Sequence, residues 1–165
     1  MAKTKEYKTN VMRVLEQKKI KYIPHEYIHQ EGEAVDGITV AESIGVPHEC
    51  VYKTLVTRGA SKVNYVFVVP VAKNLDLKKA AKAVGEKSIE MVAVKEINGL
   101  TGYVRGGCSP VGMNKQFKTV FDSSCSELDT MLVSAGKIGY QIECAPSDLI
   151  DLVRGSTDNI VADEE

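Results

Sequence analysis

The sequence has no tryptophan, only five prolines, and no basic excess, since 21 basic side chains stand against 22 acidic ones. No stretch approaches the roughly 18 consecutive apolar residues that a membrane-spanning helix needs. The first ten residues are polar and lysine-rich, with no apolar segment behind them, so they do not resemble a secretory signal. We therefore expect a soluble, cytoplasmic protein that does not contact a membrane.

The sequence also has no pair of closely spaced cysteines. Its four cysteines lack the CxxC spacing that is typical of zinc and redox sites. Because the cytosol is reducing, we expect free thiols and no disulfide. They are Cys50, Cys108, Cys125 and Cys144.

The near-neutral charge limits how the chain could bind nucleic acid. A protein that follows duplex backbone over a long path usually carries an obvious basic excess, and the net charge here is −1. Any contact with nucleic acid should therefore be local or shared with a partner. One segment gathers basic residues, which fit either a solvated helix face or a local binding patch. They are Lys73, Lys78, Lys79, Lys82 and Lys87.

Local signals predict four helices. Tyr7, Val11, Val14 and Leu15 recur at helical spacing near the start. A capping box of Thr39 and Glu42 predicts a second helix, which ends at Gly45 and Pro47. Asp76 as N-cap and Gly85 as stop predict a third, and a fourth is expected over 147–153.

Short β-rich runs alternate with these helices along the whole chain. We expect an edge strand over 21–29, because it contains Pro24, and further strands over 51–57, 63–70, 89–94, 103–105, 118–121, 130–134, 140–144 and 159–161. Many short strands and few helices predict an α+β fold with a mixed, partly closed, β-barrel-like sheet and surrounding helices. With no long linker, residues 1–165 should form a single domain.

The densest irregular feature is the loop from Arg105 to Gly112, which holds three glycines and a proline. Such a backbone can approach a ligand closely. The loop matches neither a P-loop, because Met113 follows Gly112, nor a nucleophile elbow, because Val111 stands where glycine is needed. From its pattern alone it is equally well explained as a connector or as part of a site.

Lys53 is the second unusual residue. Strand alternation places it on the same face as Val51 and Leu55, so an ammonium group lies among apolar neighbours. This pattern fits either a sheet rim with the charge in water or a pocket.

Two histidines of the first predicted strand, His25 and His29, lie roughly 13 Å apart along an extended chain, too far to bind one metal ion. The sequence indicates no metal site and no Ser-His-Asp triad.

Five segments together resemble the YbaK/EbsC family of aminoacyl-tRNA editing proteins. They appear in order over most of the chain, at 51–55, 74–81, 106–112, 133–137 and 143–149. The resemblance implies a deacylase that removes cysteine from mischarged tRNA(Pro), with tRNA(Cys) as a further substrate, and kinship with the editing domain of bacterial prolyl-tRNA synthetases. It implies no cofactor, and a complex with prolyl-tRNA synthetase as partner.

The resemblance also assigns the site residues. The family's lysine matches Lys53, a tyrosine of the first strand matches Tyr27, and an acidic residue near the last helix matches Asp148. These three are the expected catalytic residues. The expected substrate-binding residues come from the glycine-to-proline loop signature, at Gly106, Gly107, Ser109 and Pro110.

In this family the thiol of the substrate attacks its own ester carbonyl, so the protein supplies no nucleophile and Cys108 is not expected to act as one. Two alternatives stay open. A related editor that removes alanine from tRNA(Pro) has the same outline, and so does a non-catalytic module that binds an aminoacyl or nucleotide ligand for regulation. The sequence indicates no particular oligomeric state.

Overall fold

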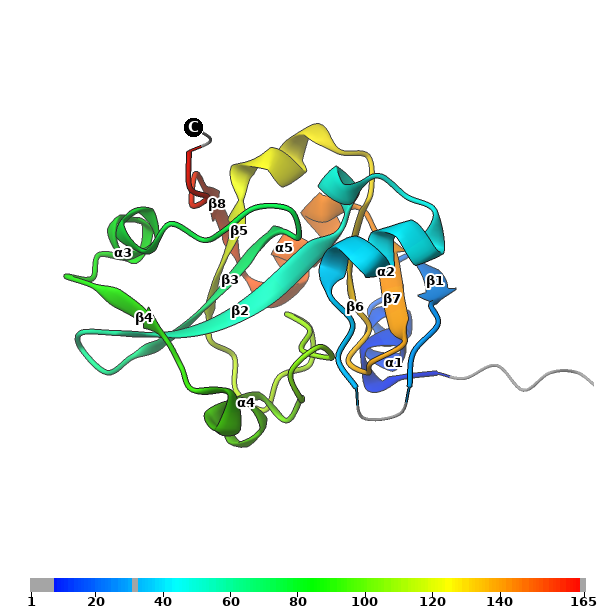
Figure 1. Cartoon of the computed structure of the whole chain (residues 1–165), viewed down its shortest axis with the longest axis horizontal. Coiled ribbons are helices and arrows are strands. Elements are labelled where there is room, and N and C mark those ends of the chain that lie inside the picture. The colour runs from blue at the N-terminus through cyan, green and yellow to red at the C-terminus, as the bar shows by residue number, and fades with distance from the viewer. Residues whose placement is uncertain (1–7, 31–32, 164–165) are drawn as a thin grey trace, which may run out of the picture.

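The computed structural model describes residues 8–30 and 33–163, which form two sheets with helices packed around them (Figure 1). The antiparallel three-stranded sheet has the order β1 (Ile23–Glu26), β7 (Tyr140–Cys144) and β6 (Met131–Ser134). The mixed five-stranded sheet has the order β4 (Ile89–Met91), β2 (Tyr52–Gly59), β3 (Asn64–Pro70), β5 (Lys118–Asp122) and β8 (Ser156–Asp158). The helices are α1 (Asn10–Gln17), α2 (Gly37–Ile44), α3 (Leu77–Val84), α4 (Val94–Thr101) and α5 (Pro146–Val153), with short 3-10 turns at His48–Cys50 and Ser123–Glu127.

The two sheets meet along one edge of β2. A parallel bridge pairs Val51, just before β2, with Leu132 of β6. At its other end β2 pairs with β4 through residues 57–59. Between these two contacts no other strand of the described residues pairs with the outer edge of β2. The expected α+β class is confirmed, but the sheets do not close into a barrel within the described part of the chain, because this stretch of edge stays open.

Burial on both faces explains why β3 reads as a continuous apolar run. One face of the five-stranded sheet contributes Val66 and Val68 to a core that also holds Leu15 of α1 and Leu149 of α5. The other face contributes Phe67 and its neighbours to a core under α3. A strand covered on both sides has no need of polar residues at alternate positions.

Several local predictions are confirmed. Asp76 caps α3 by accepting the backbone N–H groups of Lys78 and Lys79, and Gly85 ends the helix in the left-handed conformation. The strand with Pro24 is an edge strand, because β1 pairs only with β7 among the described strands. The first helix begins at Asn10, and Tyr7, which was used to predict it, lies outside the described residues.

Other predictions are wrong. The second helix begins at Gly37, because the Asp36 carboxylate accepts the Thr39 N–H and caps the chain one turn before the predicted box. Helix α4 was not predicted, and the expected strand over 103–105 is irregular. The last strand is Ser156–Asp158, where 159–161 was expected, although Val161 forms an isolated bridge with Leu75.

Candidate functional site

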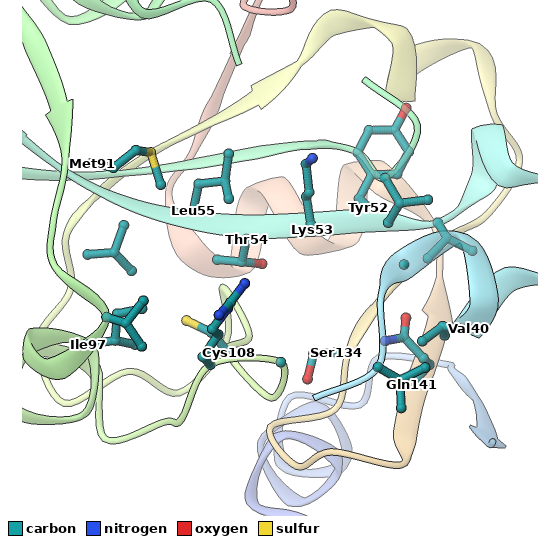
Figure 2. Close-up of a pocket in the computed structure, with 18 of the residues that line it drawn as sticks. Val40, Tyr52, Lys53, Thr54, Leu55, Met91, Ile97, Cys108, Ser134 and Gln141 are labelled. Carbon is teal, nitrogen blue, oxygen red and sulfur yellow. The ribbon is translucent and has the colours of Figure 1, made fainter. Parts of the chain in front are cut away.

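A pocket of about 440 Å³ lies beside the open edge of β2. Its walls come from segments that are far apart in the sequence: β2 itself, the start of α2, the chain over 91–97, the glycine-rich loop, and strands β6 and β7 (Figure 2). The seam between the two sheets therefore creates the hollow. The odd-numbered residues of β2 form their backbone hydrogen bonds with β3. The backbone N–H and C=O groups of the even-numbered Thr54 therefore point the other way, toward the open edge and this pocket.

Lys53 lines this pocket, so of the two environments that its pattern allowed, the pocket is the one observed. It is half-buried, and burial lowers the pKa of its ammonium group. In Figure 2, Lys53 and Leu55 project from one side of β2, whereas Thr54 projects from the other, toward Cys108. The Lys53 charge therefore lies on a different side of the strand from Cys108 and Ser134.

Tyr27 follows β1 and also lines the pocket. Its side chain is buried, and its backbone N–H donates to the carbonyl of Gly139 at 2.9 Å, which fixes its position beside the β6–β7 turn. Burial raises the pKa of the Tyr27 hydroxyl, and a hydrogen bond with the Gly139 backbone acts against that shift. The hydroxyl is therefore protonated at neutral pH and can donate a hydrogen bond.

Two adjacent glycines let the loop approach the pocket. Gly106 has φ +86°, and a Cβ there would lie 2.7 Å from the Cβ of Ala34. Gly107 is buried, and a Cβ on it would lie 3.1 Å from the backbone nitrogen of Ile138. Of the two, Gly106 lines the pocket directly, together with its neighbours Arg105 and Cys108. Gly107 holds the loop against the β6–β7 turn.

The remaining predicted residues are not brought to this pocket. Ser109 is fully buried, and its Oγ accepts the backbone N–H of Val111 at 3.2 Å, so it and the buried Pro110 shape the loop from behind. Asp148 lies in the first turn of α5 and lines a separate hollow with Lys18 and Arg154. The pocket thus gathers Lys53, Tyr27 and Gly106 from the predicted set and not Asp148.

Three polar residues of the pocket were missed by the sequence analysis. Ser134 of β6 and Gln141 of β7 are buried, and Thr54 of β2 faces them across the hollow (Figure 2). Ser134 Oγ accepts the backbone N–H of Gly136 at 3.1 Å. Alternation along β2 could have indicated Thr54, since it opposes Lys53, but no local pattern places Gln141 beside it.

Cys108 lines the pocket as a neutral thiol. Burial raises its pKa to about 11, so the thiolate that a nucleophile requires is scarce at neutral pH. The described cysteines all carry free thiols, of which Cys125 and Cys144 are buried and Cys50 and Cys108 are partly buried.

In the part of the chain that the structure describes, no group of three or more His, Cys, Asp or Glu residues could hold a metal ion.

The lysine cluster lies outside the pocket. Its Lys79 forms an ion pair with Asp163 at 2.8 Å and donates a hydrogen bond to the carbonyl of Val161. Within residues 8–30 and 33–163, no helix has the length and apolar character to cross a bilayer.

Comparison with known proteins identifies the family of this chain. The model of the aminoacyl-tRNA editing domain matches residues 33–152, which include every wall of the pocket except Tyr27. The chain belongs to this editing-domain family. A relative from Enterococcus faecalis, named as a candidate Cys-tRNA(Pro)/Cys-tRNA(Cys) deacylase, EbsC, is 44% identical over 99% of this chain and 100% of its own length.

Solved structures share the fold of this editing domain. One, described as a candidate trans-editing enzyme for prolyl-tRNA synthetase, is 22% identical, with a TM-score of 0.78 over 93% of this chain and 95% of that chain. Another, a hypothetical protein, is 18% identical, with a TM-score of 0.82 over 92% of this chain and 99% of that chain. At these identities the likeness establishes the fold alone.

Proposed function

We propose that this editing domain is a deacylase that removes cysteine from mischarged tRNA(Pro) in the cytoplasm, with cysteinyl-tRNA(Cys) as a second substrate. The observation that supports it most is the pocket of about 440 Å³, large enough for a small aminoacyl group and part of a ribose, in a chain 44% identical to EbsC. Proline and cysteine differ little in size, so a charging site rejects cysteine poorly and a second hydrolytic site is needed.

The chemistry requires little from the protein. The aminoacyl ester is already activated, and the sulfur of the substrate attacks its carbonyl carbon to form an S–C bond. The ester C–O bond then breaks, the terminal ribose oxygen takes a proton, and a thiolactone leaves to be hydrolysed by water. This route accounts for a pocket whose own thiol, Cys108, is held neutral by a pKa near 11.

Three groups would help this step. The partly buried ammonium of Lys53 would bind the terminal adenosine or the developing negative charge, since burial strengthens its electrostatic effect. The backbone N–H of Gly106 would offer a hydrogen bond to the carbonyl oxygen, in the manner of an oxyanion hole, whereas the N–H of Gly107 already donates to the carbonyl of Val104 at 2.9 Å. The buried hydroxyl of Tyr27 would orient the ribose.

We further propose that prolyl-tRNA synthetase supplies much of the tRNA recognition. The chain has a net charge of −1, so it offers little electrostatic attraction for a tRNA body. Binding through a partner that already holds tRNA(Pro) would remove the need for a basic surface. The pocket itself then has to accept only the aminoacylated end.

The deciding experiment offers cysteine-charged and alanine-charged tRNA(Pro) to the purified protein and follows release of each amino acid. We expect rapid release of cysteine and slow release of alanine. Preferential release of alanine would make this an alanine editor, because the pocket accepts either side chain. Release of neither, with retained binding of the charged tRNA, would make it a non-catalytic binding module.

A further inference from the structure

Two buried polar atoms of the pocket have no hydrogen-bond partner among the described residues. They are Thr54 Oγ1 on β2 and Gln141 Oε1 on β7. The Gln141 side chain is 6% exposed, and both residues line the same hollow. A buried polar atom without a partner costs stability, because it loses its bonds to water and gains none in return. Two such atoms in one pocket indicate that a bound ligand supplies their hydrogen-bond partners.

The chemistry of these atoms restricts what the ligand group can be. A carboxamide oxygen only accepts hydrogen bonds, so Gln141 Oε1 requires a donor, whereas the Thr54 hydroxyl can accept or donate. Thr54 and Gln141 lie on facing walls that belong to different sheets (Figure 2). A ribose hydroxyl can satisfy both atoms only where Thr54 acts as the donor, because its single proton is needed by Gln141 Oε1. An α-amino group has two or three N–H bonds and can donate to both atoms.

We propose that Gln141 and Thr54 bind the α-amino group of the aminoacyl ester, and that Gln141 thereby restricts this editing domain to substrates with a free amino group. The assignment deepens the proposed function and rests on it. An N-blocked ester, such as peptidyl-tRNA, would bury an amide where these acceptors need an amine and would place its added chain against the wall of the pocket. The protein would therefore spare peptidyl-tRNA during translation.

The position of Gln141 suits recognition. Its strand is the central one of the three-stranded sheet, where Gln141 pairs with His25 on one side and Ser134 on the other. Both neighbouring strands hold its backbone in place before a ligand arrives, which reduces the entropy lost on binding. Its neutral amide accepts from a charged or an uncharged amine. Lys53 projects from the opposite side of β2 from Thr54, and Arg105 of the glycine-rich loop also lines the pocket.

The test compares two esters on tRNA(Pro): cysteine, and 3-mercaptopropionate, which keeps the thiol but has hydrogen in place of the amino group. Gln141→Met keeps the length of the side chain and removes the acceptor, and Thr54→Val does the same on the other wall. We expect each variant to lose roughly 10- to 100-fold in kcat/KM on the cysteinyl ester, as for hydrogen bonds to charged groups. On the mercaptopropionyl ester each should stay within about twofold of wild type.

Stability and a matched control separate recognition from folding. Removing an unpartnered buried amide should leave Tm unchanged or raise it, whereas a structural glutamine would lower Tm when replaced. Gln17→Met, on the exposed side of α1, should change neither activity nor Tm. Equal losses on both esters, or no loss on either, would overturn the assignment while leaving the deacylase function in place.

A binding measurement keeps the test independent of turnover. The probes are 3′-deoxy-3′-(cysteinylamino)adenosine and its counterpart without the α-amino group, both linked by a stable amide. Wild type should bind the amine-bearing probe roughly 10-fold more tightly, and Gln141→Met should bind the two alike. If wild type fails to release cysteine yet shows this preference, the proposed reaction is wrong and the amine site stands; equal affinities in wild type would refute the amine site.

Discussion

Lys53→Met is the sharpest test of the proposed site, because it removes the charge and keeps most of the side-chain volume. Burial lowers the pKa of Lys53, so the folded protein holds this charge at a cost that it would not bear in water. A charged donor in such a setting stabilises developing negative charge strongly. Losing one such donor usually costs about 10²–10³ in rate, or ~3–4 kcal/mol. We expect kcat/KM on cysteinyl-tRNA(Pro) to fall by that factor.

The thermal stability of Lys53→Met should stay the same or rise, although its activity falls. A lysine whose folded pKa lies below its unfolded value destabilises the fold at pH values below the folded pKa, and the penalty fades as the pH rises through the folded and then the unfolded pKa. Lys53→Met should therefore unfold at the same or a higher temperature than wild type at pH 7.

Single-turnover deacylation at varied enzyme concentration is the assay, because it separates binding from chemistry. A rise in apparent Kd with an unchanged maximal rate would place Lys53 on the terminal adenosine, and a fall in maximal rate would place it on the reacting centre. Lys118→Met, an exposed lysine of β5 outside the pocket, is the control. Near-normal turnover in Lys53→Met, or a loss of activity that follows a loss of folding, would refute the reasoning.

Three other measurements follow from the structure. Serine-charged tRNA(Pro) should be a poor substrate, because a hydroxyl is far less acidic than a thiol of pKa ~8.5, and Cys108→Ala should stay within about tenfold of wild type; equal rates for serine and cysteine would contradict thiol attack. The isolated protein should bind tRNA(Pro) weakly at physiological salt, and added prolyl-tRNA synthetase should raise deacylation at low tRNA concentration; tight binding by the free protein would argue against a shared recognition. Thr130→Val should lower the free energy of unfolding by about 1 kcal/mol at neutral pH, because the Thr130 hydroxyl, more than His25, holds the pKa of Glu143 below its ordinary value. That stability is lost as the pH falls through the folded pKa of Glu143, so the acid-unfolding curves of the two proteins should converge at pH values below it.

Sequence signals predicted those elements whose ends are set by local chemistry. Helix α3 was predicted because Asp76 and Gly85 satisfy its end groups from adjacent positions. Helix α4 was missed because its N-cap residue is Ala93, whose side chain cannot accept a hydrogen bond, and because it contains Gly99 in its interior. The pairing of β1 with β7 and the separation into two sheets depend on contacts between distant segments, which periodicity does not record.

The site shows the same division. Lys53 and the loop around Gly106 could be predicted because they carry short, recognisable patterns. Gln141 could not, since it reaches the pocket only through the packing of β7 beside β2, and glutamine in a strand has no pattern of its own. Asp148 shows the converse case, because a family match gives a position in the chain and not the direction in which α5 presents its side chain; it lines a separate hollow, and its catalytic role stays a prediction.

The seam between the sheets bears on how this protein could change its substrate over evolutionary time. Met91, Val94 and Ile97 on one wall and Ser134 and Gln141 on another are attached to separate sheets or to the α4 segment, and none of them belongs to the large apolar core. A substitution in one wall therefore alters the space for the side chain of the substrate with little disturbance of the packing that holds the fold. Descendants of one ancestral sequence can acquire new amino-acid preferences by single steps, each compatible with a folded intermediate.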